Sequence, residues 1–204
     1  MQPEYELKVM SSHHFVKEGQ EPALFILEGI SYQRIEPLLE WVPLILVGQP
    51  ALETVLKWGI KIDVLLQYES LPDLEERIGD QFPLQIISCK KDDMIQTGLQ
   101  ILVQNKNTSV NLISAQNTEI FSRLETFGDQ IQVGLYHENE KWSFINSGKF
   151  EKWIPLGHKI FLKQQLPDSF KTEGLIQKGE FWETIGSGMV IIRSKSPFWI
   201  CESL

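Results

Sequence analysis

The sequence predicts an α/β domain built on a doubly wound parallel sheet, followed by an all-β domain with a sandwich or barrel architecture. Up to about residue 127, short apolar runs alternate with stretches of helical periodicity, which is typical of a parallel sheet covered by helices on both faces. After Gly128 the helical periodicity stops, and short segments rich in aromatic and β-branched residues alternate with turn signals. We therefore expect one domain at residues 1–128 and a second at residues 129–204.

Each element of the first domain follows from its apolar pattern. Strands are expected at residues 22–29, 43–48, 60–66, 83–89 and 109–115. Helices are expected at residues 31–42, 51–59, 92–106 and 119–128, with a further amphipathic stretch at 71–80. Ser31 is a plausible N-cap, Pro37 interrupts the first helix or starts its second part, and Gly59 and Gly128 stop the helices that precede them. This succession is Rossmann-like.

The second domain is predicted from seven strand-like segments. They cover residues 130–137, 141–145, 150–154, 158–164, 179–184, 189–194 and 197–203. Four tryptophans in this region are expected in the core or at an interface, and the alternative is that one of them stacks on an aromatic ligand: Trp142, Trp153, Trp182 and Trp199.

Composition limits the possible partners. The chain has 204 residues, of which 42% are hydrophobic, so it can bury a sizeable core. Asp and Glu number 27 against 19 Lys and Arg, for a net charge of −8, and no basic cluster occurs, so a nucleic-acid partner is not expected. No apolar run is long enough to span a bilayer, so we expect no membrane partner, and the first residues do not resemble a signal peptide. We therefore expect a cytoplasmic protein.

The strand ends of the first domain are the place to look for chemistry, because ligands of open α/β sheets bind beyond the carboxyl ends of the strands. Three of these ends carry an amide where a charge might stand, namely Gln49, Gln67 and Asn117. The acids in these turns are Glu69, Asp92 and Asp93. Lys91 and Asp92 could be catalytic or could form a charged helix cap, and Cys89 could be a reactive or a buried thiol.

The order of these motifs resembles that of the thiamine pyrophosphokinase family over about residues 22–204. That family carries Gly-Asp-aromatic-Asp-Ser after its third strand, where this chain has residues 66–70, LQYES. It carries Lys-Asp-x-Thr-Asp at the next helix start, where this chain has residues 91–95, KDDMI. The TEGL at 172–175 is similar to the Thr-x-Gly-Leu of the family's β domain.

The resemblance implies a set of site residues and partners. Family members use Mg²⁺ and ATP, pair through their β domains and place thiamine at the dimer interface, so the resemblance implies a homodimer and a thiamine-like small molecule. By position, it assigns nucleotide binding to Gln49, Gln67, Ser70 and Asn117, catalysis to Lys91 and Asp92, and metal binding to Glu69 and Asp92.

The departures from the family pattern favour a degenerate member. Gln67 and Ile95 stand where the family has carboxylates that hold Mg²⁺, and Glu69 is one methylene longer than the Asp that it replaces. The family's glycine turn falls at residues 49–51, QPA, and its Gly-Gly-Arg-x-Asp-His motif falls at 117–122, NTEIFS. We therefore expect a binding or structural homodimer that has lost catalysis. The alternatives are an active kinase with a metal site rebuilt from Glu69, Asp92 and Asp93, and a scaffold that binds no ligand.

Overall fold

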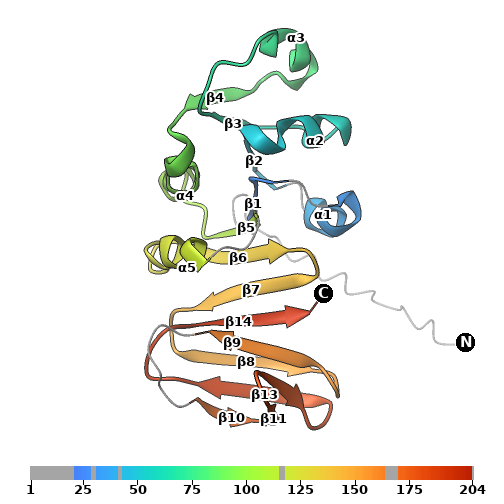
Figure 1. Cartoon of the computed structure of the whole chain (residues 1–204), viewed down its shortest axis with the longest axis vertical. Coiled ribbons are helices and arrows are strands. Elements are labelled where there is room, and N and C mark those ends of the chain that lie inside the picture. The colour runs from blue at the N-terminus through green and yellow to red at the C-terminus, as the bar shows by residue number, and fades with distance from the viewer. Residues whose placement is uncertain (1–20, 29–30, 41–42, 115–117, 164–169, 204) are drawn as a thin grey trace, which may run out of the picture.

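The parallel sheet predicted for the first part of the chain is confirmed. The computed structural model describes residues 21–28, 31–40, 43–114, 118–163 and 170–203 (Figure 1). The parallel strands lie in the order β6-β5-β1-β2-β3-β4. They are β1 (Ala23–Ile26), β2 (Ile45–Gly48), β3 (Val64–Gln67), β4 (Gln85–Ser88), β5 (Ser109–Ile113) and β6 (Gln132–His137). The chain moves from β1 to one edge at β4 and then returns to the other side of β1 at β5, so the sheet is doubly wound.

Helices cover both faces of this sheet (Figure 1). One face carries α1 (Tyr32–Leu39) and α2 (Leu52–Lys57), and the other carries α4 (Met94–Gln104) and α5 (Thr118–Glu125). The alternation of side chains along β1 explains the two layers. Leu24 and Ile26 pack into the core under α1 and α2, whereas Phe25 packs under α4 and α5.

The remaining helical segments are short. The stretch at 71–80 forms α3 (Leu74–Arg77) followed by the 3₁₀ turn η2 (Gly79–Gln81). Two more 3₁₀ turns, η1 (Gln49–Ala51) and η3 (Lys91–Asp93), follow strand ends. Ser31 stands at the N-cap of α1 in an extended conformation, but its side chain makes no capping hydrogen bond. None of the helices in the described ranges has the length and hydropathy that a membrane crossing requires.

The second part of the chain is rich in strands, as predicted. Its strands are β7 (Glu140–Ile145), β8 (Lys149–Ile154), β9 (Lys159–Lys163), β10 (Lys171–Glu173), β11 (Leu175–Lys178), β12 (Phe181–Thr184), β13 (Gly188–Arg193) and β14 (Phe198–Ser203). Five of them, in the order β11-β12-β9-β14-β7, extend the large sheet beyond β6 in antiparallel pairing. The other three form a second sheet in the order β10-β13-β8.

The two sheets form a sandwich, and the large sheet is continuous between the two parts of the chain. Ile154 and Ile192 of the small sheet share one core with Ile160, Phe198 and Ile200 of the large sheet. β6 was expected in the second domain, yet it pairs in parallel with β5, so the hydrogen-bonded sheet runs without a break through the boundary expected at residue 128. The strands β10 and β11, on either side of a glycine with φ of 79° at position 174, were not predicted.

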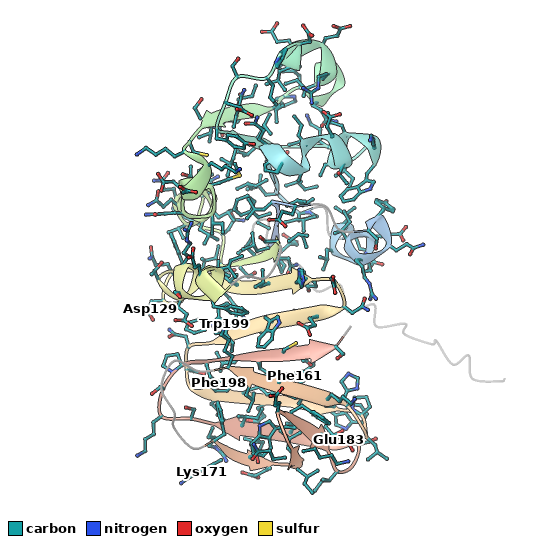
Figure 2. The ribbon with its side chains drawn as sticks, in the orientation of Figure 1. Asp129, Phe161, Lys171, Glu183, Phe198 and Trp199 are labelled. Atoms are coloured by element: carbon teal, nitrogen blue, oxygen red, sulfur yellow. The ribbon has the colours of Figure 1, made fainter. Side chains whose placement is uncertain are left out.

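Aromatic residues join α5 to the β-rich part. Trp199 of β14 points toward α5 (Figure 2), where its ring lies 5.0 Å from that of Phe121 and its Nε1 donates a hydrogen bond of 2.8 Å to Glu125. Phe198, the preceding residue, packs on the opposite face in the sandwich core. Trp142 and Trp199 are buried as predicted, whereas Trp153 is 59% exposed. The two parts therefore share one sheet and a packed aromatic junction.

Candidate functional site

A cavity of about 300 Å³ lies at the carboxyl ends of the parallel strands. Residues that follow β1 and β5 line it, and these neighbouring strands are the point at which the chain reverses its direction across the sheet. This is where doubly wound sheets bind their ligands. The floor of the cavity is apolar, since Leu27, Met94 and Ile120 are all nearly inaccessible to solvent.

Charged side chains of both signs stand around this cavity. The acids are Glu28, Asp92 and Glu119, and the bases are Lys91 and Arg123. Arg123 of α5 is engaged on two sides, because its Nη1 donates a 2.6 Å hydrogen bond to the backbone carbonyl of Asp92 and its Nη2 lies 3.7 Å from Glu119 Oε2. Acids therefore outnumber bases in the lining, and one of the two bases is already paired.

The amide of Gln49 points into the protein. Gln49 is only 8% exposed, and its Oε1 accepts hydrogen bonds from the backbone N–H groups of Tyr68 at 2.9 Å and Glu69 at 3.2 Å. Its Nε2 donates to Glu69 Oε1 at 3.4 Å. The amide after β2 thus fixes the turn after β3.

The other predicted residues of that turn serve local structure or face solvent. Gln67 Nε2 donates a 2.6 Å hydrogen bond to the backbone carbonyl of Glu69, and Ser70 is exposed. The Glu69 carboxylate faces Gln49 and does not line the strand-end cavity. Asn117, the fourth residue assigned to nucleotide binding, lies outside the described residues.

Lys91 and Asp92 lie in η3, directly before α4. The Lys91 ammonium lies over the ring of Tyr68, 5.6 Å from its centroid, while Asp92 holds Arg123 through its backbone carbonyl. Neither Lys90 nor Asp93, the residues at the two N-cap positions, makes a side-chain capping hydrogen bond. The negative charges still suit the start of α4.

The neighbouring cysteine is poorly suited to nucleophilic chemistry. Cys89 is half-buried, and burial, reinforced by the carboxylate of Asp93, raises the pKa of its thiol above the ordinary value. Since the thiolate is the reactive form, the structure favours the interpretation of Cys89 as an unreactive packed thiol.

The residues present do not fit a dedicated Mg²⁺ site. Mg²⁺ requires oxygen ligands in near-octahedral geometry. Asp92 lines the strand-end cavity together with the aliphatic Ile95, and both also line the adjoining groove between α4 and α5, where Asp93 lies. Over the described ranges, no three His, Cys, Asp or Glu side chains come close enough together to hold a metal ion.

Sequence reasoning overlooked several residues of the cavity. Glu28 follows the first apolar run directly, so the end of that run could have revealed it in the same way as the other strand ends. Ser114 precedes the predicted turn by one residue. Arg123 enters from the second turn of α5, and no sequence signal distinguishes it from an arginine on the solvent face.

The fold and the position of the cavity define the class: an α/β protein with a strand-end ligand site, extended by a β-sandwich. No protein-family model matches the chain, and no curated protein matches it. Solved structures do. A thiamin pyrophosphokinase family protein from Enterococcus faecalis superposes with a TM-score of 0.68 at 11% identity, over 89% of this chain and 99% of that one.

Two further structures have the same architecture. Thiamin pyrophosphokinase from Geobacillus thermodenitrificans superposes with a TM-score of 0.67 at 15% identity, over 89% of this chain and 97% of that one. The enzyme from Candida albicans gives 0.68 at 10% identity, over 90% of each chain. The chain therefore has the fold of the thiamine pyrophosphokinases, as the sequence resemblance predicted.

Proposed function

We propose that this protein is a thiamine pyrophosphokinase-like binding or structural homodimer of the cytoplasm that does not transfer diphosphate. The observation that carries the proposal is the orientation of the strand-end amides. The side-chain amides of Gln49 and Gln67 both hydrogen-bond to the backbone of the turn at 67–70, so they are not presented to a nucleotide.

The electrostatics of the cavity support the same proposal. Diphosphoryl transfer relies on positioning and on neutralisation of the charge that spreads over the phosphate oxygens. Loss of one well-placed electrostatic group commonly costs ~10²–10³ in rate. Here Gln67 and Ile95 stand where the resemblance places two carboxylates, and three acids against two bases line the cavity. Several such losses together leave little catalysis.

An assay for AMP release from ATP in the presence of thiamine and Mg²⁺ tests the proposal. We expect no turnover above that of a boiled sample. Robust turnover that disappears in Glu69→Gln would contradict the proposal and would support the active kinase with a rebuilt metal site. The matched control is Glu53→Gln, because Glu53 lies on α2 and pairs with Arg77 away from the cavity.

An exposed apolar patch on the β-rich part supports the homodimer. Trp153 of β8 and Met189 of β13 are cross-strand partners and are 59% and 52% exposed. Large exposed apolar side chains that gather in this way mark interaction surfaces. The patch comprises Trp153, Leu156, Ile185 and Met189.

Leu156 and Ile185 lie in two turns that hydrogen-bond to each other. The Leu156 N–H donates to Ser187 Oγ at 3.0 Å, and Thr184 Oγ1 donates to the Pro155 carbonyl at 2.6 Å. These bonds hold the two exposed aliphatic side chains on neighbouring turns at 64% exposure each.

Sedimentation equilibrium on matched variants tests the dimer. We expect Trp153→Ser to dissociate it, and Phe82→Ser to leave it intact because Phe82, 62% exposed, lies in the α/β part. A monomeric wild-type protein, or a Trp153→Ser variant as dimeric as wild type, would contradict pairing through this patch. A thiamine-like small molecule remains the proposed ligand of such a dimer.

A further inference from the structure

Charged groups of both signs line the strand-end cavity. The Lys91 ammonium lies over the ring of Tyr68, in the turn after β3. The backbone carbonyl of Asp92 accepts a hydrogen bond from Arg123, which is paired with Glu119. The lining therefore receives both a cation and a carboxylate from the turn η3, directly before α4.

Lys91 and Asp92 are the charges left to meet a ligand. In the described part of the chain neither side chain takes part in an ion pair, although other lysines and acids of the protein do. Arg123, in contrast, already has both a backbone carbonyl and a carboxylate as partners. The cavity thus offers one cation and one anion beside an apolar floor.

The same features disfavour a polyphosphate. Pro50 stands in the wall where a phosphate-binding turn would supply a backbone N–H, and proline has no N–H. Acids outnumber bases in the lining, and Arg123 is already paired with Glu119, so the lining disfavours a multiply charged anion. A ligand without excess negative charge suits this lining better.

We infer that the strand-end cavity binds a small zwitterion with an apolar side group, of the kind represented by a free aliphatic amino acid. The ammonium of the ligand lies at Asp92 and its carboxylate lies at Lys91. Its apolar group fills the floor formed by Leu27, Met94 and Ile120. The volume of about 300 Å³ is at the lower end for ligand pockets, which restricts the ligand to a compact molecule. The inference rests on the proposed loss of nucleotide binding, since a bound nucleotide would occupy the same cavity.

Three matched probes test the inference on the unaltered protein. Leucine carries both charges, N-acetylleucine lacks the cation, and leucinamide lacks the carboxylate. In titrations followed by NMR chemical shifts, we expect leucine to bind and each analogue to bind about two- to fivefold more weakly, as for the loss of one exposed ion pair. If leucine does not bind, or if an analogue binds as well as leucine, the inference is overturned.

Variants that each remove one charge test which residue binds the ammonium of the ligand and which binds its carboxylate. Lys91→Gln is expected to lower the affinity for leucine to that for leucinamide and to leave the affinity for leucinamide unchanged. Asp92→Asn is expected to lower the affinity for leucine to that for N-acetylleucine and to leave the affinity for N-acetylleucine unchanged. Asp93→Asn is the control, because Asp93 is the adjacent acid but lines the α4–α5 groove instead. Equal losses in Asp92→Asn and Asp93→Asn would overturn the assignment.

A parallel titration with MgATP separates this inference from the proposed function. Tight MgATP binding would contradict the proposed function. Absence of both MgATP and leucine binding would overturn only the zwitterion site.

Discussion

Replacement of the buried Gln49 by leucine is predicted to destabilise the protein. Leucine preserves most of the side-chain volume but removes the acceptor for the N–H groups of Tyr68 and Glu69. A buried donor left without a partner costs about 1–3 kcal/mol. Tyr68 is half-buried and Glu69 is exposed, so water partly replaces the lost acceptor. Taking the low end for both donors, we expect a loss of about 2 kcal/mol in the free energy of unfolding.

Urea denaturation of two further variants isolates the hydrogen bonds. Gln49→Glu keeps an acceptor for both N–H groups but places a second carboxylate next to Glu69, so an intermediate loss is expected. Gln67→Leu removes a single bond on a half-buried side chain and is expected to cost about 0.5 kcal/mol. If Gln49→Leu is no less stable than Gln67→Leu, the amide does not fix the turn and the reasoning is refuted.

Three further predictions concern packing and titration. Gly98→Ala would place a Cβ 2.3 Å from Phe25 Cε1, so we expect the free energy of unfolding in urea to fall by a net of about 1–2 kcal/mol after the helix propensity of alanine is counted. Gly79→Ala is the control, because a Cβ there would meet nothing within 4 Å, and it should cause no loss. Equal effects of the two substitutions would contradict this packing. Trp199→Phe removes the indole hydrogen bond to a carboxylate of α5 and should lower the free energy of unfolding by about 1–3 kcal/mol, and an unchanged melting temperature would show that the junction does not need that bond. Burial, with two nearby carboxylates, raises the pKa of the Cys201 thiol from 9.0 to about 12, so the folded state holds a proton that the unfolded state releases; stability should decline as pH rises from 9 toward 12, and Cys201→Ala should decline less over that range. Parallel pH profiles for wild type and Cys201→Ala would contradict this origin of the decline.

The fold was largely predictable because it depends on side-chain periodicity. Leu24 and Phe25 are both apolar, and a strand that is apolar on both faces requires a helical layer on each side. The continuity of the sheet was not predictable in this way, because the pattern of residues 132–137 suits β6 equally well beside β5 or in a separate domain. The short strand β10 carries no apolar residue, so no apolar periodicity could predict it.

The site was less predictable than the fold. A glutamine at a strand end has the same sequence signature whether its amide faces a ligand or the next turn, and only the structure shows that Gln49 bonds to Tyr68 and Glu69. The role of Arg123 depends on how α5 approaches Asp92 across the strand ends, which is a tertiary relation between residues 31 positions apart. The assignments of Ser70 and Asn117 to nucleotide binding remain predictions.

Titration of the purified protein with MgATP in a calorimeter tests the central claim most directly. Because the amides of Gln49 and Gln67 bond to the turn after β3 and acids exceed bases around the cavity, we predict no saturable heat at ATP concentrations that saturate an active kinase. Micromolar affinity for MgATP that is lost in Asp92→Asn would contradict the claim that the site no longer supports phosphoryl transfer.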